Sequence, residues 1–226
     1  MNLFLDTNIW LGLYHAPQEE LDGLARLSAG IAEGGITLFL TEQVVDELER
    51  NREKVVAEGV RLLLEDPFEE PLPAIGRGCP EHGEVEEAIR AYQEAKARLI
   101  ERLAADTAAR NLPADRLLAG LFPKARLLAV TDEIFERARR RFDRGNPPGK
   151  EGSYGDALHW ECLLAGVPDG EGLAFVTADR DFRSQLDERA LAPFLAAEWR
   201  RRKGSEVTFF RRLSTFLVSL PDGAPR

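Results

Sequence analysis

The residues of this sequence best suited to chemistry are carboxylates that directly follow apolar runs. Asp6 comes after the apolar residues 3–5, and Asp179 comes just after the strand-like run 173–177. Short runs of this kind are typical of strands buried on both faces in a parallel sheet. Both aspartates are therefore expected at the carboxyl ends of strands, where open α/β sheets place their ligand crevice. A carboxylate there is costly to desolvate unless a partner or a metal ion binds it.

Two further acidic residues are predicted to face the same crevice from helices. Glu47 lies three residues after Val44 on an expected helix, and this periodicity favours it over Asp46 as the inward carboxylate. Asp156 lies in the first turn of a helix expected at 154–165. Each has a purely structural alternative, because glutamate usually lies on solvated helix flanks and the helix dipole stabilises an aspartate in the first turn.

Four carboxylates that converge in one crevice repel one another and cannot all stay ionised without a counter-charge. A hard divalent cation with oxygen ligands, Mg²⁺ or Mn²⁺, is the natural counter-charge. Such an ion, or a pair of ions about 4 Å apart, can lower the pKa of a bound water and hold a phosphate group. The acidic set therefore predicts a metal site that acts on phosphate esters.

The elements that must position these residues alternate between strands and helices. Strands are expected at 3–5, 36–40, 126–130, 173–177 and, at an edge of the sheet, 207–210. Helices are expected at 18–33, from Thr41 to about 64, from 84 to about 110, up to Gly120, from Thr131 into the basic run 137–144, at 154–165 and at 188–203. This alternation predicts an α/β fold, a three-layer α/β/α, Rossmann-like arrangement around a central, mainly parallel sheet of about five strands.

Local signals mark where these helices begin. Thr41, Thr131 and Ser153 are predicted to cap the helices that follow them, and Asp181 is predicted to be an N-cap. Gly155, beside Asp156, allows a backbone or a ligand to approach closely. Residues 66–83 are rich in proline and glycine, which predicts a loop without regular structure.

The chain is expected to form a single domain that spans residues 1–226. We interpret residues 66–123 as a helical insertion that covers one edge of its core. Residues 145–152 form a second loop, which can be neither helical nor paired in a sheet.

Composition excludes several classes of protein. The 226 residues carry a formal net charge of −9, which argues against a protein that coats nucleic acid by bulk electrostatics. Two basic runs, 137–144 and 200–203, are rich in arginine, the better bidentate partner for phosphate, although a solvated helix face explains them equally well. No apolar run approaches the roughly 20 residues of a membrane span, no signal peptide is expected, and two distant cysteines favour a reducing cytoplasm.

Four motifs, in the order of the chain, resemble the acidic motifs of PIN-domain ribonucleases. They are Leu5-Asp6-Thr7-Asn8, Glu47-Leu48, Gly155-Asp156-Ala157 and Thr177-Ala178-Asp179-Arg180-Asp181-Phe182. The resemblance covers residues 1–56 and 126–212 and says little about 57–125. The loop from Gly145 to Lys150 is similar to that of a longer subgroup of stand-alone bacterial and archaeal PIN proteins rather than to the compact toxins.

The resemblance implies a PIN-like fold and a metal-dependent endoribonuclease that hydrolyses single-stranded RNA. Asp6 and Asp179 would be the main ligands of Mg²⁺ or Mn²⁺. Asp156 would bind the ion directly or through water, and Glu47 would order the attacking water. No acidic position of the family carries a neutral residue here, which is what an active enzyme requires.

Other residues would support this site or bind the RNA. Asn8 and Thr177 would be polar supports, and Asp181 would be an acid that contacts the metal ligands rather than the metal. The residues expected to bind the RNA backbone are Lys150, Arg139, Arg140 and Arg144. The family relation also raises the expectation of a homodimer and of an inhibitor protein of the antitoxin type, although no stretch of sequence identifies either interface.

Three other functions have less support. A phosphatase of the haloacid-dehalogenase type also starts with a strand and an aspartate, but it needs a second aspartate where this chain has Asn8. Zinc chemistry needs paired ligands, but His15, His82 and His159 are scattered, and Cys79-x-x-His82 has no second pair after it. A PIN-like module that binds RNA or a partner protein without cutting is the main alternative, and the acidic net charge favours it.

Overall fold

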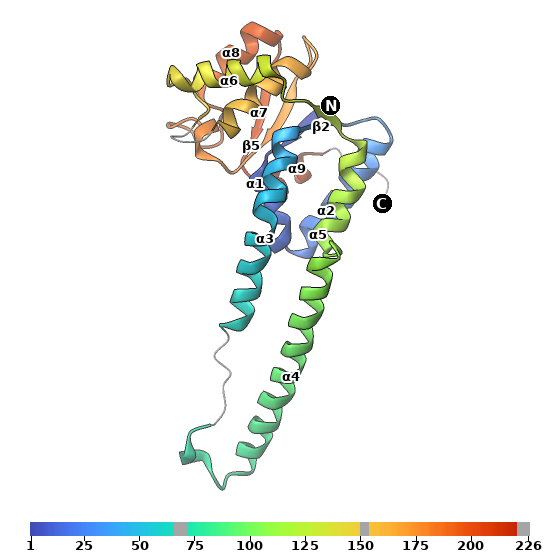
Figure 1. The fold of residues 1–226 in the computed structure, drawn as a ribbon, viewed down its shortest axis with the longest axis vertical. Coiled ribbons are helices and arrows are strands. Elements are labelled where there is room, and N and C mark those ends of the chain that lie inside the picture. The colour runs from blue at the N-terminus through green and yellow to red at the C-terminus, as the bar shows by residue number, and fades with distance from the viewer. Residues whose placement is uncertain (66–71, 150–153, 221–226) are drawn as a thin grey trace.

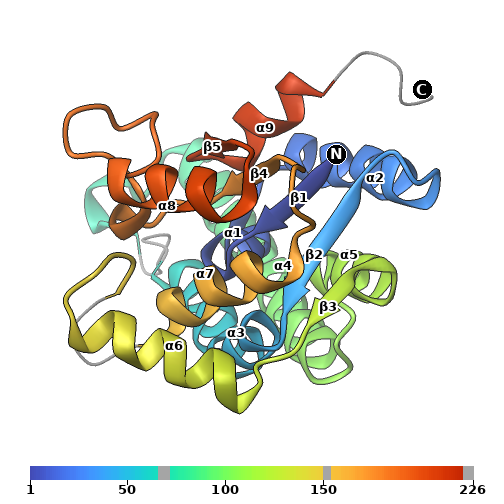
Figure 2. The same ribbon diagram turned by 90° about the horizontal axis from the view of Figure 1, so that it is seen from above.

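A five-stranded parallel sheet forms the centre of the molecule (Figures 1 and 2). The structure is a computed structural model that describes residues 1–65, 72–149 and 154–220. The strands lie in the order β3-β2-β1-β4-β5, and every pair is parallel, so the predicted α/β fold is confirmed. Their bounds are Asn2–Leu5 for β1, Thr37–Thr41 for β2, Arg126–Leu128 for β3, Leu173–Val176 for β4 and Val207–Phe210 for β5.

Helices cover both faces of the sheet, which gives the three predicted layers (Figures 1 and 2). One face carries α6 (Asp132–Asp143), α7 (Gly155–Gly166) and α8 (Pro193–Lys203). The other face carries α2 (Gln18–Ala32), α5 (Pro113–Leu121) and α9 (Leu213–Ser219). Two helices start directly at the carboxyl ends of strands, α1 (Thr7–Gly12) after β1 and α3 (Glu42–Leu64) after β2. Short 3-10 turns span Leu13–His15, Ala74–Gly76, Phe122–Lys124 and Arg180–Phe182.

The core is densest around β1, the central strand. Residues 3–5 are fully buried, and the ring of Phe4 stacks on that of Phe175 in β4 with centroids 5.2 Å apart. The fully buried Trp10 donates its indole N–H to the carbonyl of Leu5 at 2.8 Å. This bond holds α1 against β1, so the turn between them, which contains Asp6, is held on both sides.

Two of the predicted helix caps are confirmed. The hydroxyl oxygen of Thr41 accepts the N–H of Val44 at 3.2 Å, and that of Thr131 accepts the N–H of Ile134 at 3.3 Å. Each bond satisfies a backbone donor that has no partner within the first turn. Ser153, the third predicted cap, lies outside the described residues.

Two predicted helix boundaries are wrong, and proline is the reason in both cases. Helix α4 (Pro80–Ala108) begins at Pro80 rather than at Glu84, and α8 begins at Pro193 rather than at residue 188. Proline is favourable at the first helical position because its φ is already helical and its missing N–H would have no partner there. The loop predicted to lack regular structure also contains the turn Ala74–Gly76.

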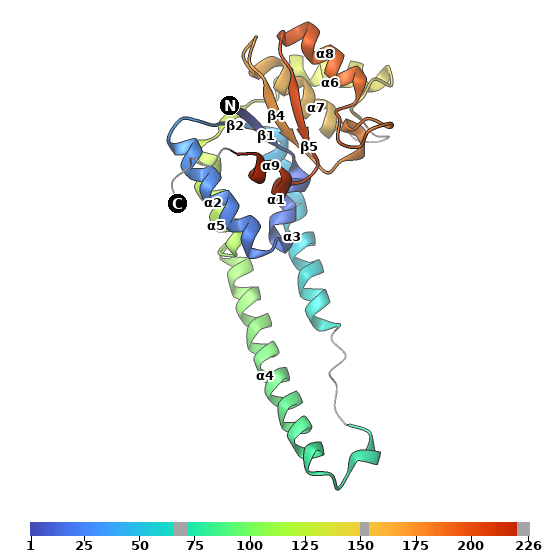
Figure 3. The same cartoon turned by 180° about the vertical axis from the view of Figure 1, so that it is seen from behind.

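Helices α3 and α4 form a long arm that projects away from the sheet (Figures 1 and 3). Within the described residues of the predicted insertion, the last part packs on the core, where α5 lies against α2 and the rings of Phe122 and Trp10 meet edge-on at 5.2 Å. Helix α4 instead runs beside α3, and Ile89 is its one buried residue. The expectation that the insertion covers an edge of the core is therefore wrong for α4. Within the described parts of the chain, no helix is long and apolar enough to cross a membrane.

A buried ion pair fastens the arm to the body of the protein. Arg52 of α3 donates to both oxygens of Asp115 in α5, at 2.8 and 2.6 Å, and Tyr14 donates to the same carboxylate at 2.6 Å. Burial would raise the pKa of Asp115, but the hydrogen bonds from Arg52, Tyr14 and the N–H of Leu112 hold this pKa below its usual value. The carboxylate therefore stays ionised in the folded protein and pairs fully with the guanidinium.

We expect Asp115→Asn to lower the free energy of unfolding at pH 7 by about 3 kcal/mol, because it leaves Arg52, whose side chain is 11% exposed, without its counter-charge. The folded pKa of Asp115 lies below the ordinary value of about 3.9, so the stabilisation is present above about pH 4 and is lost as pH falls through the folded pKa. Urea unfolding at pH 7 and in a series down to pH 3 measures both effects. The matched control is Glu94→Gln on exposed α4, expected to change stability by less than about 0.5 kcal/mol; equal losses in both variants would contradict the buried pair.

Candidate active site at the carboxyl edge of the sheet

Asp6 lies at the carboxyl end of β1 and is only 3% exposed. Its Oδ1 accepts the backbone N–H of Thr7 at 2.7 Å. Its Oδ2 accepts the side chains of Asn8 at 2.6 Å and Thr177 at 2.5 Å. The parallel register of β1 and β4 brings Asp6 and Thr177 side by side. The buried carboxylate is therefore solvated by protein donors in place of water.

Thr177 and Asn8, the two predicted polar supports, connect Asp6 to the loop after β4. The hydroxyl oxygen of Thr177 accepts the N–H of Asp179 at 2.9 Å while its O–H donates to Asp6. The side-chain carbonyl of Asn8 accepts the N–H of Ala178 at 3.0 Å. These bonds set the direction in which residues 178–181 leave the sheet.

Asp156, Asp179 and Asp181 come together at this edge and form an acidic cluster. One carboxylate oxygen from each lies within 4.8 Å of the other two, and all three residues are half-buried. Asp156 comes from the first turn of α7, whereas Asp179 and Asp181 belong to the segment after β4. Asp179 accepts the N–H of Asp181 at 2.9 Å and so caps the 3-10 turn. The predicted N-cap role of Asp181 is therefore wrong, and its carboxylate lies in the cluster.

Glu47 reaches the site from the second turn of α3. Its Oε2 accepts the hydroxyl of Thr7 at 2.5 Å, and its Oε1 accepts the amide of Gln43 at 2.7 Å. Gly155 lies against the same carboxylate, since a Cβ on this residue would overlap Oε1 of Glu47. The close approach predicted for this glycine is thus that of the Glu47 side chain. Asp46 is exposed, as the helical periodicity predicts.

His159 of α7 is buried beneath the carboxylates, and sequence reasoning did not find it. Its Nε2 lies 3.4 Å from Oε2 of Glu47 and 3.8 Å from Oδ1 of Asp6. Its Nδ1 lies 2.8 Å from the hydroxyl oxygen of Thr41. The one signal available in the sequence was its position three residues after Asp156, which places both on one side of a helix.

The charges around His159 divide unequally between Glu47 and Asp6. Burial disfavours the imidazolium, but the hydrogen bond to Glu47 and the charges of Asp6, Glu47 and Asp156 raise the pKa of His159 above its usual value. Burial also disfavours ionised Glu47, yet His159 and the donors around it lower the pKa of Glu47 to about 2. For Asp6, burial outweighs His159 and the hydrogen bonds, so its pKa is raised. A charged His159 therefore favours ionised Glu47 more strongly than ionised Asp6.

The site's donor set fits a hard divalent cation. The cluster offers three carboxylate oxygens, and no histidine or cysteine of the described residues joins it. Oxygen-only, anionic sets suit Mg²⁺ and Mn²⁺ better than softer metals. The raised pKa of Asp6 points the same way, because a nearby cation favours the ionised carboxylate.

The arginines predicted to bind substrate form no described hydrogen bond or ion pair with the acidic residues of the site. Arg139 pairs with two acidic residues of its own helix, at 3.7 and 3.8 Å. Arg140 and Arg144 are exposed. Lys150 lies outside the described residues. A role for these four residues in binding RNA stays a prediction.

Arg141 shows that the basic run 137–144 is not one surface. This residue is buried, and its Nη2 lies 2.6 Å from Glu161 and 2.7 Å from Glu198. Glu198 also accepts the indole N–H of the fully buried Trp160 at 2.8 Å. Arg141 therefore joins α6, α7 and α8, and its charge is used within the fold.

A family model matches the part of the chain that contains this site. The model describes the PIN domain, and the match covers residues 3–182, a span that includes all four predicted acidic residues. The chain belongs to the PIN-domain family. Comparisons with curated proteins and with solved structures give no match. The matched span includes the arm. Membership in the subgroup of longer stand-alone PIN proteins, which was inferred from the loop that starts at Gly145, stays a prediction.

We expect Gly155→Ala to lower the free energy of unfolding of this PIN domain by about 1–3 kcal/mol, because the new Cβ displaces the Glu47 carboxylate from its hydrogen bonds with Thr7 and Gln43. Gly120→Ala in α5 is the matched control, since the space around its Cβ position is open, and it should be neutral or stabilising by up to about 1 kcal/mol. Urea unfolding followed by circular dichroism measures both variants. Wild-type stability in Gly155→Ala would show that Glu47 does not pack against α7 as described.

Proposed function

We propose that this PIN-domain protein is a metal-dependent endoribonuclease that hydrolyses phosphodiester bonds of single-stranded RNA. The observation that carries the proposal is the approach of Asp156, Asp179 and Asp181 to one another at the edge where Asp6 is buried. Hydrolysis of a phosphodiester needs a water nucleophile and compensation of phosphate charge, and an anionic oxygen site for a divalent cation serves both needs.

Mg²⁺ or Mn²⁺ would be held by the acidic cluster together with Asp6. Asp181 is part of this proposed set because its carboxylate oxygen lies within 4.8 Å of those of Asp156 and Asp179. When bound, the ion supplies a water of lowered pKa and positive charge against the phosphate. The pKa of Asp6 is raised, so a cation beside it would favour the ionised carboxylate.

Glu47 is the residue best placed to order the attacking water. A carboxylate with a pKa of about 2 stays ionised at neutral pH and is a weak base, so it orients a water by accepting its hydrogen bond more readily than it removes a proton. Thr7, Gln43 and His159 fix the orientation of this carboxylate. They are positioning residues for Glu47.

The finer parts of the proposal come from the family relation and the sequence. They are RNA as the polymer, Mg²⁺ or Mn²⁺ as the ion, and the cytoplasm as the location. A homodimer and an inhibitor protein of the antitoxin type are predictions of the same origin. Size-exclusion chromatography coupled to light scattering tests the homodimer directly.

The proposal predicts cutting of a labelled, mixed pool of single-stranded RNA in Mn²⁺ that stops in EDTA. The double variant Asp6→Asn/Asp179→Asn should lose at least about a hundredfold in rate, since metal sites contribute several kcal/mol of charge stabilisation. Glu47→Gln should also lose about a hundredfold or more. Asp46→Asn, which changes the exposed neighbour of Glu47, is the matched control and should cut like wild type.

Equal cutting by wild type and the double variant at saturating Mn²⁺ would refute the proposed site. The alternative, a non-catalytic module that binds RNA or a partner protein, is separated by thermal denaturation. A module without a metal site shows no change in melting temperature with Mg²⁺ or Mn²⁺, whereas a protein that binds the ion only when folded is stabilised.

We expect Thr177→Val to weaken Mn²⁺ binding by about 10–100-fold, because the hydroxyl holds both the Asp6 carboxylate and the backbone of Asp179. Isothermal titration calorimetry on folded protein measures the affinity. Thr208→Val, an exposed threonine in β5, is the matched control and should bind like wild type. An unchanged affinity in Thr177→Val would remove this hydroxyl from the proposed site.

A further inference from the structure

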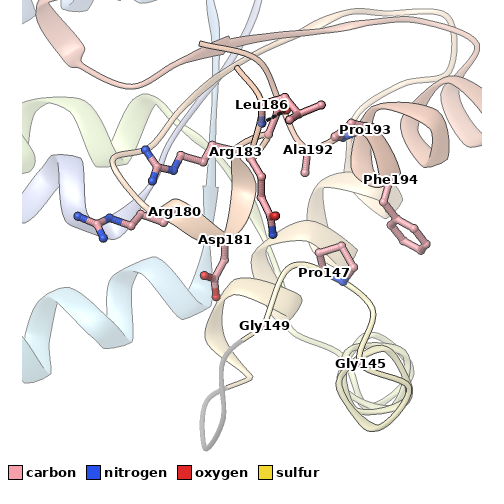
Figure 4. Close-up of a pocket in the computed structure, with 12 residues that line it drawn as sticks. Gly145, Pro147, Gly149, Arg180, Asp181, Arg183, Leu186, Ala192, Pro193 and Phe194 are labelled. Atoms are coloured by element: carbon pink, nitrogen blue, oxygen red, sulfur yellow. Dashed lines mark hydrogen bonds between the residues drawn. The ribbon is translucent and has the colours of Figure 1, made fainter. Parts of the chain in front are cut away.

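Two hollows flank residues 178–189, the segment that carries two aspartates of the cluster. One lies between the loop 145–149, residues 180–186 and the start of α8 (Figure 4). The other is bounded by Ala178, Glu188, Arg189 and residues 209–212, and its volume is about 750 Å³. We call this second one the arginine hollow, after the three arginines in its lining.

The arginine hollow borders the acidic site through the ends of β4 and β5. Ala178 lies in its wall, immediately before Asp179, and is held by Asn8 at 3.0 Å. Phe210, at the end of β5, also lines the hollow, and its carbonyl accepts the N–H of Thr177 at 3.0 Å. A ligand in the hollow is therefore next to the residues that position Asp6 and Asp179.

Positive charge gathers in the hollow although the chain as a whole carries −9. Arg189 and Arg212 are exposed, and within the described residues their side chains form no hydrogen bond or ion pair. Arg211 and Arg183 share a single carboxylate, that of Glu188, with Arg183 at 2.6 Å. Glu188 thus compensates one of two guanidinium groups, and the hollow keeps an excess of positive charge.

The other hollow has less positive charge, because its lining combines two arginines, Arg180 and Arg183, with Asp181. Figure 4 shows Arg180 and Arg183 extending away from Phe194 and Pro147, which lie on its opposite side. On the arm, Arg102 pairs with Asp106 at 2.9 Å, and Arg110, just after α4, pairs with Glu49 of α3. The arginine hollow therefore stands out among the described surfaces next to the cluster.

We propose that the arginine hollow binds the backbone of single-stranded nucleic acid on one side of the bond to be cut. The proposal rests on the proposed function, because it extends the same site and names its substrate-binding part. Arg189, Arg211 and Arg212 contact phosphates, for which the planar guanidinium is well suited. The net charge of −9 disfavours nucleic acid on much of the remaining surface, so a local excess of arginine directs it to the hollow.

The aromatic walls favour a single strand over a duplex. Phe209 and Phe210 are half-buried and line the hollow beside the arginines. Basic residues with aromatic rings form the usual platform for unpaired bases, since every base has a face that can stack. Paired bases of a duplex stack on each other and leave no face free for these rings.

Fluorescence anisotropy with a labelled 12-nucleotide RNA of mixed sequence tests the proposal, in EDTA so that no cutting intervenes. The test variant is Arg189→Ala/Arg212→Ala. The matched control is Arg26→Ala/Arg201→Ala, which removes the same charge from two exposed arginines of α2 and α8 that have no described partner. The two variants and wild type are titrated between about 50 and 200 mM salt, the range over which phosphate contacts lose affinity measurably.

The test variant should bind about tenfold or more weakly than wild type at low salt. Its slope of log affinity against log salt should fall in magnitude by about 1.4, the value for two phosphate contacts on a single strand. The control should bind like wild type, and a duplex of the same sequence should bind wild type less tightly than the single strand. Equal affinities of test variant and control, no binding by wild type, or equal binding of duplex would each overturn the proposal.

Cleavage by wild type in Mn²⁺ is measured separately and keeps the two proposals distinct. If the protein binds RNA through the hollow but does not cut it, the proposed nuclease activity is refuted and the proposed role of the hollow stands. If the protein cuts RNA but the test variant and the control bind RNA equally well, the nuclease proposal stands and the proposed role of the hollow is refuted.

Discussion

The burial of the Asp6 carboxylate at the end of the central strand is the constraint on which the site depends. A desolvated carboxylate needs donors of fixed geometry, and here they come from Thr7 and Asn8 at the start of α1 and from Thr177 after β4. His159 of α7 adds its charge at 3.8 Å. Thr177 is in reach only when the parallel register of β1 and β4 is correct, and His159 only when α7 lies on the sheet. The site is therefore complete only when these tertiary contacts have formed.

Helices α3 and α7 carry both the site and the contacts that hold it. Helix α7 provides Asp156 and the buried His159, and its Gly155 admits the Glu47 side chain of α3. Helix α3 continues from Glu47 to Arg52, whose ion pair with Asp115 fastens the arm. Helix α3 thus joins the proposed water-ordering carboxylate to the arm, and His159 supplies positive charge beside Glu47 and Asp6.

The distribution of charge could not be derived from runs of like residues in the chain. The run 137–144 contains Arg141, which the fold buries between two glutamates, and Arg139, which pairs within its own helix. The arginines beside the site come instead from positions 180–189 and 211–212, which form no long run. They meet because β4 and β5 are parallel neighbours and their carboxyl ends share one edge. Whether an arginine is free depends on which acids the fold brings to it.

The sequence by itself determined the parallel α/β fold, the caps at Thr41 and Thr131, and the placement of Asp6 and Asp179 at strand ends, because burial and capping are local properties that the side-chain pattern records. It also indicated that Glu47, rather than Asp46, faces inward. Only the tertiary structure decided that Asp181 joins the cluster, that His159 lies beneath it and that α4 extends into solvent. These features depend on contacts between residues far apart in the chain, such as the 112 positions between His159 and Glu47, and periodicity carries no information about such contacts.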